Sequence, residues 1–265
     1  MQDLAHLLLN DAILSAACFF VLWLISVAIK DPSFIDAWWG AGVALLAWAT
    51  YLQLAPASPH ALLLTALATA WGLRLGVYLI WRWRKHGHDR RYAKMLGDAK
   101  TKQGMNFATS SLLYVFAPQM LLQLILALPV MIGQVGPQTS LSWLANTGAA
   151  LAIFGILYEA IADAQLAHFK SLESNADKVM NIGLWRYSRH PNYFGELCTW
   201  WGIYLVACNS AYGAWTIVSP ILITFLLTRV SGAPTTEPHL KRSRPDYEAY
   251  KARTSAFIPL PPKAS

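Results

Sequence analysis

The chain has 265 residues, of which 55% are hydrophobic, only 13% are charged and 12 are tryptophan. A soluble domain carries about 25% charged residues, so the composition excludes an ordinary soluble protein and indicates an integral membrane protein. The formal net charge of +7 would favour a nucleic-acid partner in a soluble chain. In a membrane protein the positions of the basic residues matter more than their sum, and we expect membrane lipids and no nucleic acid as partners.

Seven apolar runs approach or exceed the roughly 20 residues that a helix needs to cross a bilayer. They lie at 11–29, 37–55, 61–81, 109–132, 141–166, 193–208 and 213–230. No internal repeat or low-complexity linker separates them. The sequence therefore predicts an all-α fold: one domain over residues 1–265, forming a polytopic integral membrane protein with seven transmembrane helices.

Lysine and arginine gather in alternate connecting segments. Lys30 follows the first run, and larger groups follow the third, fifth and seventh runs at 82–102, 170–189 and 229–263. The segments 1–10, 56–60, 133–140 and 209–212 contain no lysine or arginine. Because basic residues are retained on the cytoplasmic side, we expect the N-terminus outside and the C-terminus in the cytoplasm.

A few polar residues lie inside or at the edge of the apolar runs, where charges are costly and commonly face a cavity or a partner. Asp36 enters the second run, Arg74 lies in the third, and Glu159 and Asp163 lie four residues apart in the fifth. Positions i and i+4 share one helix face, so the two acids need a cation or hydrogen-bond donors. Either Arg74 neutralises one of them and the set only fixes helix packing, or the group lines a ligand cavity together with Tyr78, one turn further on.

The stretch from 183 to 201 is polar and basic in its first half and apolar in its second. Pro191 fits the first turn of a helix, because it lacks an amide hydrogen and has a fixed φ. The free amides of that helix start, with Arg186 and Arg189 just before it, form a potential anion site. Asn192 and Glu196 share one face of the predicted helix. The alternative is a basic interfacial loop whose arginines face lipid headgroups.

Two further basic segments are expected on the same side of the membrane, the loop 82–102 and the tail with Arg229, Lys241, Arg242 and Arg253. Arginine forks and interleaved Tyr and Trp suit a ligand with several phosphates. The sequence contains neither GxGxxG nor GxxxxGK[ST], so a nucleotide site would be of neither the Rossmann nor the P-loop kind.

Residues 188–196, Ser-Arg-His-Pro-Asn-Tyr-Phe-Gly-Glu, resemble the C-terminal signature of the membrane steroid 5α-reductase superfamily, most closely its bacterial branch. The Arg-His-Pro-Asn-Tyr core is also similar to sterol C14-reductases and isoprenylcysteine carboxyl methyltransferases. Further matching pieces are Trp200-Trp201-Gly202, Asp36-Ala-Trp-Trp-Gly40, Trp71-Gly-Leu-Arg-Leu75, Asp89-Arg-Arg-Tyr92, Glu159 to Leu166, Val230-Ser-Gly-Ala-Pro234 and Glu237 to Pro259.

This resemblance implies an NADPH-dependent reductase of the bacterial inner membrane, with its site open to the cytoplasm. It would saturate the C4–C5 double bond of a 3-oxo-Δ4-steroid or a similar lipophilic enone, by hydride transfer to the β-carbon and protonation of the enolate. Residues 1–108 would supply the substrate-side helices and 109–265 the cofactor-binding portion.

The resemblance also implies roles for individual residues. The nicotinamide and ribose would be lined by Asp163, Asn192, Tyr193 and Glu196. The diphosphate would be held by Tyr187, Arg189 and Arg229, and the 2′-phosphate by Arg82, Lys85, Arg90 and Arg91. Other cofactor-binding residues would be His190, Glu237, Tyr247 and Arg253, the last two from the tail. The substrate would contact Trp39, Trp71, Arg74 and Glu159.

Eukaryotic members of the superfamily polarise the substrate carbonyl with a Glu and a Tyr from the second and third helices. In this chain the second run offers Asp36 in place of Glu, and the third offers Tyr78, while Trp71 stands at the position expected for Tyr. Our hypothesis for the catalytic pair is therefore Asp36 with Tyr78.

Two other classes remain open at the level of sequence. A membrane methyltransferase using S-adenosylmethionine shares the Arg-His-Pro core, but its cofactor lacks phosphates and leaves the loop arginines with less to bind. A transporter or lipid-binding protein could use the buried charges as a relay, although the paired broken helices of many transporters are missing. The scattered histidines predict no metal site.

Overall fold

The computed structural model describes residues 2–55, 58–136 and 140–263, and in this part of the chain every regular element is helical. The long helices are α1 (Gln2–Ile29), α2 (Ile35–Gln53), α3 (Pro59–His86), α6 (Ala117–Ile132), α7 (Trp143–Ser171) and α8 (Pro191–Ala207). The shorter ones are α4 (Arg90–Gln103), α5 (Phe107–Ser111), α9 (Val218–Phe225), α10 (Ala233–Ser243) and α11 (Tyr247–Arg253). The all-α prediction is confirmed.

Among the residues that the structure describes, five helical segments are long and apolar enough to cross a membrane: Leu4–Ile29, Pro59–Lys85, Phe107–Ile132, Trp143–Ser171 and Gly213–Ser243. They correspond to the first, third, fourth, fifth and seventh predicted runs, and they mark an integral membrane protein. The second and sixth runs form α2 and α8, of 19 and 17 residues, which are not among those five segments.

The helix boundaries follow from local chemistry. Ser58 and Ser142 accept hydrogen bonds from the amides of Ala61 and Ala145 and so cap α3 and α7. Pro191 opens α8, as its sequence predicts. Two π-helical turns, Leu112–Phe116 and Leu226–Val230, continue α5 into α6 and extend α9. Their irregular hydrogen bonding was not predicted from the sequence.

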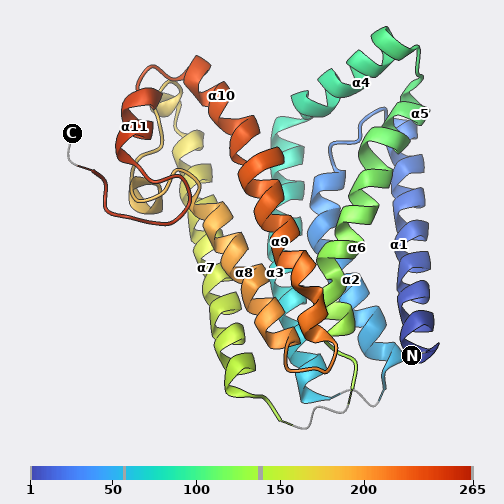
Figure 1. Ribbon diagram of the computed structural model, residues 1–265. Coiled ribbons are helices and arrows are strands. Elements are labelled where there is room, and N and C mark those ends of the chain that lie inside the picture. The colour runs from blue at the N-terminus through green and yellow to red at the C-terminus, as the bar shows by residue number, and fades with distance from the viewer. Residues whose placement is uncertain (1, 56–57, 137–139, 264–265) are drawn as a thin grey trace.

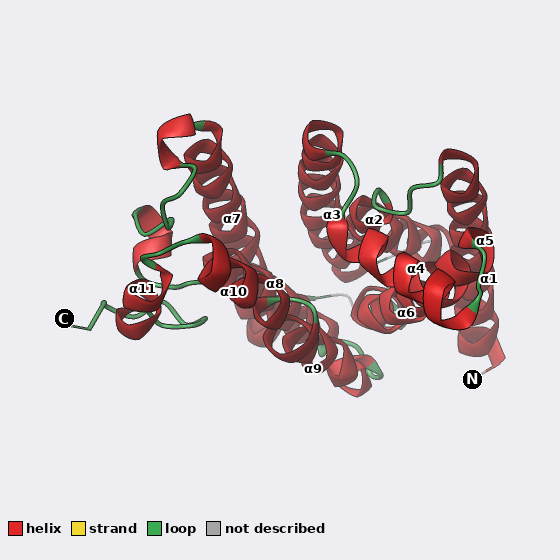
Figure 2. Cartoon of the chain, turned by 90° about the horizontal axis from the view of Figure 1, so that it is seen from above, coloured by secondary structure: helices red, strands yellow, loops and turns green. Residues whose placement is uncertain are grey.

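Figure 1 shows the long helices running alongside one another, with α4, α10 and α11 gathered at the end opposite the N-terminus. Seen from above, α4 lies across the ends of α1, α2 and α6, α10 lies by the end of α8, and α11 lies to the outer side of α7 and α8 (Figure 2). The basic segments 82–102, 170–189 and 229–263 all lie at this end, which we call the basic end.

Small residues bring α7 and α8 unusually close. A Cβ added to Gly155 would lie 2.4 Å from the amide nitrogen of Thr199, and one added to Gly195 would lie 2.6 Å from the amide nitrogen of Glu159. Close backbone approach of this kind is typical of helix pairs in membranes, where van der Waals packing replaces the hydrophobic effect. The pairing fixes how the polar residues of α7 face those of α8.

Deeper in the bundle, α3 packs on α8 through Trp71 and Trp200. Both side chains are fully buried, and their rings meet edge to face with centroids 4.9 Å apart. Leu64, Ala152 and Ile203 belong to the same apolar core. This core holds α3 against α7 and α8.

Candidate functional site

The first part of the candidate site is a buried ion cluster that joins α3 to α7. The Arg74 guanidinium pairs with Glu159 through Nη2 and with Asp163 Oδ2 through Nη1, the latter at 2.7 Å. The side chains of Glu159 and Asp163 are only 3% and 8% exposed. Arg74 therefore bridges both acids, and not only one of them.

Helix α8 adds Asn192 and Glu196 to this Arg74 cluster. Asn192 Nδ2 donates to the second oxygen of Asp163 at 3.2 Å, and the charge of Glu196 acts on Arg74 and Glu159. Three carboxylates face one guanidinium, so the cluster needs protons or further donors to balance its charge. Oε2 of Glu159 and Oδ1 of Asn192 are buried without a partner among the described residues. Such atoms commonly mark a place for a ligand or water.

A second polar network surrounds Asp36 at the start of α2. Tyr92 of α4 donates to Asp36 Oδ1 at 2.5 Å, and Arg91 Nη2 donates to Oδ2 at 3.0 Å. Gln119 of α6 donates to the Tyr92 hydroxyl at 2.8 Å and accepts from Trp39 Nε1 at 2.7 Å. Burial and the charge of Asp36 raise the pKa of Tyr92, so its phenol stays a donor.

Tyr92 and Gln119 were not singled out from the sequence. Tyr92 was visible only as the last residue of the Asp-Arg-Arg-Tyr piece, and Gln119 as a polar residue in an apolar run. The Asp36 network therefore draws on residues 56 and 80 positions apart in the chain, a relation that no local pattern reveals.

Asp36 and Tyr78, the predicted catalytic pair, lie on the closely packed helices α2 and α3. Gly76 faces the backbone oxygen of Ala37, so the two residues lie at a similar depth in the bundle. The hydrogen bonds of Asp36 go to Tyr92 and Arg91 and not to Tyr78. No hydrogen bond from a described residue occupies the Tyr78 hydroxyl, whose surroundings include the charges of Asp163 and Arg74.

The third part of the site is the Glu237 cluster, which ties the tail to the segment before α8. Glu237 Oε1 accepts from Nε and Nη2 of Arg189, each at 2.9 Å, and lies 3.2 Å from His190 Nε2. Lys251 Nζ is 2.9 Å from Oε2. Arg189 Nη1 donates to the carbonyl of Thr254 at 2.7 Å. The guanidinium expected on a diphosphate is thus held by the tail.

Two tyrosines complete the contact of the tail with this segment. Tyr250 donates to the carbonyl of Trp185 at 2.5 Å, and Tyr247 is 1% exposed beside it. The ring of His190 stacks on Tyr193, with centroids 5.2 Å apart and planes within 7°. Tyr247 lies against Tyr250, with ring centroids 6.2 Å apart, whereas no side-chain contact is described for Arg253.

The charge of Arg82 acts on residues from several parts of the site. It acts on Asp36, on Asp163 and on Tyr193, so all three lie within the electrostatic reach of Arg82. Of the other predicted cofactor residues, Lys85 lies over the Trp81 ring at 5.4 Å, and Arg90, Tyr187 and Arg229 are exposed. Trp71, predicted to contact substrate, lies in the apolar core. No group of three potential metal ligands occurs among the described residues.

The fold and the site together define a helical membrane protein with buried ion clusters beneath a basic end. The chain belongs to the family described as "Protein of unknown function (DUF1295)", whose model matches residues 22–254. No curated protein and no solved structure matches the chain.

Proposed function

We propose that the protein is an NADPH-dependent reductase of lipophilic enones, of which 3-oxo-Δ4-steroids are the first substrate class to test. Its family is related to steroid 5α-reductase-like membrane proteins. The observation that carries the proposal is the convergence of the Arg74 cluster, the Asp36 network and Tyr193 around Arg82. Buried acids below a ring of cations suit a polyanionic cofactor that meets a membrane-borne substrate.

The residues present fit NADPH in their donor chemistry. The unpartnered oxygens of Asn192 and Glu159 suit the carboxamide and ribose donors, with Asp163, Tyr193 and Glu196 beside them. The phosphates would be held by Arg82, Lys85, Arg90, Arg91, Tyr187 and Arg229. Arg189 would join them by exchanging Glu237 for the diphosphate. His190, Tyr247 and Arg253 would support this side of the site.

When bound, NADPH supplies the hydride for the β-carbon of the enone. In this proposal the free Tyr78 hydroxyl donates a hydrogen bond to the substrate carbonyl and stabilises the negative charge that develops there. Asp36 orients the network that closes the site on the α2 side, through Tyr92 and Gln119. Trp39 and the face of α3 that carries Trp71 exclude water from the substrate. Arg74 and Glu159 hold the helices around the ring system of the substrate.

We also propose that α2 and α8 cross the membrane with the five longer segments, giving seven spans with the basic end in the cytoplasm of a bacterial inner membrane. The distribution of lysine and arginine supports this orientation. A fluorescent protein fused after residue 265 should fluoresce, and a phosphatase that needs the periplasm should be inactive at that position. The reverse pattern would reject the orientation.

The decisive experiment is NADPH oxidation by the detergent-purified protein in the presence of progesterone, with the product identified by mass. A gain of two hydrogens supports the reductase. If NADPH stabilises the protein against heat without turnover, the substrate class is wrong and the cofactor assignment stands. If S-adenosylmethionine stabilises it and NADPH does not, the methyltransferase alternative replaces the proposal.

A further inference from the structure

Helix α4 differs from every helix around it, because it lies across the end of the bundle instead of along it (Figure 1). Asp89 caps its first turn by accepting from the amide of Arg91, and Gly104 ends it in a left-handed conformation. Leu96 and Ala99 are buried against the bundle, while its remaining faces are polar. A helix with one apolar side and a basic polar side is suited to the membrane interface.

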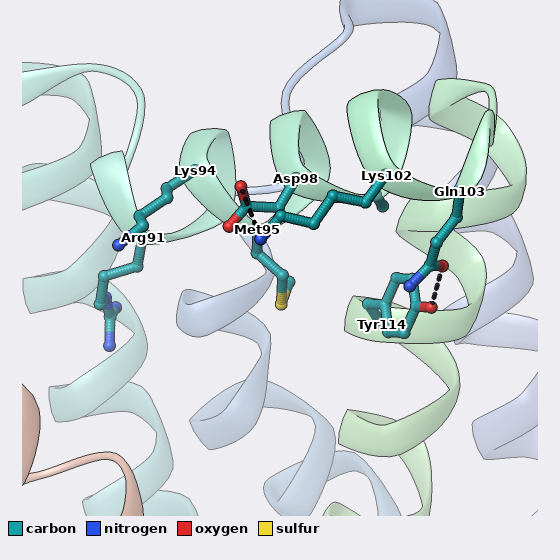
Figure 3. Close-up of a pocket in the computed structure, with 8 residues that line it drawn as sticks. Arg91, Lys94, Met95, Asp98, Lys102, Gln103 and Tyr114 are labelled. Carbon is teal, nitrogen blue, oxygen red and sulfur yellow. Dashed lines mark hydrogen bonds and ion pairs between the residues drawn. The ribbon is translucent and has the colours of Figure 1, made fainter.

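Beneath α4 lies a groove with a volume of about 520 Å³. Its wall is formed by Met95, Ala99 and Tyr114, and its rim by Arg91, Lys94 and Lys102. Figure 3 shows the side chain of Met95 below the helix and Tyr114 at one end, where its hydroxyl donates to Gln103 at 2.6 Å. The groove therefore combines a largely apolar wall with a cationic rim.

The charges of the two lysines on the rim are weakly compensated. Lys94 has no ion pair with a described residue, and the 3.5 Å pair of Lys102 with Asp98 is between side chains that are 72% and 48% exposed. Exposed pairs of this kind contribute little. Arg91 is shared between Asp36 and Asp89. Because these two acids already compensate Arg91, the net attraction of the rim for an anion comes from Lys94 and Lys102, which face the single acid Asp98.

The groove is continuous with the surface that faces lipid. Tyr114 lies in the π-helical turn before α6, and its neighbours Leu112 and Leu113 are exposed apolar residues. Tyrosine beside exposed leucine is typical of the level where hydrocarbon meets headgroups. An occupant must therefore present an anion to the rim and an apolar chain to the wall.

We propose that this groove binds an anionic phospholipid of the surrounding bilayer. Its phosphodiester lies between Lys94 and Lys102, and one acyl chain follows Met95 and Tyr114. Lysine ammonium groups suit a phosphate as compact point charges, and basic residues at a membrane surface favour anionic lipid. The inference depends on the groove and not on the proposed reductase activity.

Lipid retention tests the proposal directly. Protein purified in detergent is titrated with phosphatidylglycerol or phosphatidylcholine, and bound lipid is counted by native mass spectrometry. We expect selective retention of phosphatidylglycerol. The double variant Lys94→Gln, Lys102→Gln should bind it roughly thirtyfold less tightly, since each basic residue near an anionic headgroup contributes about a factor of five. The variant Lys94→Arg, Lys102→Arg should retain binding.

The matched control removes two exposed cations of the basic end that do not line the groove, as Lys100→Gln, Lys178→Gln. Lys100 lies on the opposite side of α4 from the groove, so this variant should keep the selectivity of the wild type. Equal losses in the two double variants would mean a general surface-charge effect and would overturn the proposal. Equal retention of phosphatidylcholine would overturn it too, as would displacement by the same concentration of glycerol 3-phosphate.

Discussion

Arg74 on α3 donates a hydrogen bond of 2.7 Å from Nη1 to Oδ2 of Asp163 on α7. The same guanidinium pairs with Glu159 one turn away, so a single cation compensates two buried acids. This contact joins the helices that precede α4 to those that follow α6. The candidate site is therefore assembled across both halves of the chain.

Removing Arg74 should destabilise the bundle. Arg74→Met leaves Glu159 and Asp163 buried without their cation, and breaking a buried ion pair from one side costs about 3–5 kcal/mol. The measurement is the thermal midpoint of unfolding in detergent. Adding Glu159→Gln and Asp163→Asn to Arg74→Met should recover most of the loss, because no uncompensated charge then remains. A single variant as stable as the wild type would contradict this account.

The close packing of α7 on α8 gives a second prediction. Gly155→Ala places a Cβ 2.4 Å from the amide nitrogen of Thr199, so the helices must separate, at a cost of about 1–3 kcal/mol. Gly97 in α4 is the matched control, because a Cβ there meets nothing within 4 Å. Gly97→Ala should stabilise the protein by about 0.5–1 kcal/mol, since alanine favours helix. The two thermal shifts should have opposite signs.

The predicted catalytic pair, Asp36 and Tyr78, can be tested by substitution. If Tyr78 donates to the carbonyl, Tyr78→Phe should lower kcat by about a hundredfold or more while the thermal shift caused by NADPH is unchanged. Asp36→Asn should lower kcat with the same unchanged cofactor response. Tyr212→Phe is the control, because Tyr212 is exposed in the loop after α8. Near-normal turnover in both variants would reject the catalytic pair.

The sequence predicted those parts of the site that depend on local spacing. Glu159 and Asp163 lie on one face because they are four residues apart, and Pro191 begins α8 because of its fixed φ. Contacts between distant segments were not predictable. The hydrogen bonds to Asp36 from Tyr92, and to Asp11 from Thr50 at 2.7 Å, depend on how separate helices pack.

Arg189 also shows how far the sequence alone can predict the site. Its position before a helix start indicated an anion site, and the structure gives it an anion from the chain itself, Glu237, 48 residues away. A sequence pattern identifies the kind of partner that a guanidinium needs. It does not decide whether a ligand or the protein supplies that partner, because this depends on where the tail folds.

The junction between α3 and α4 should lose stability only in acid. Burial would raise the pKa of Asp89, but hydrogen bonds from Arg91 lower it below the ordinary value of 3.8. A carboxylate with a depressed pKa stabilises the folded state above its unfolded pKa, and this contribution disappears as the pH falls below about 3.8. The difference in thermal midpoint between wild type and Asp89→Asn should be constant at higher pH and vanish below that window.

The Glu237 cluster predicts how the tail is held. Glu237 accepts from Arg189 and Lys251, and the side chains of Glu237 and Arg189 are only 14% and 11% exposed. In Glu237→Gln the two cations lose their shared anion, so α11 should detach from the segment 183–190. Trypsin should then cleave the tail after Lys251 and Arg253 at least about tenfold faster, because local opening exposes the sites.

Glu248→Gln is the matched control for this prediction. It removes a carboxylate whose pair with Lys241 lies between side chains that are 58% and 65% exposed, and such pairs contribute little. Its proteolysis should therefore match that of the wild type. Equal rates for Glu237→Gln and Glu248→Gln would mean that Tyr250 and the backbone contacts, and not Glu237, hold the tail against the start of α8.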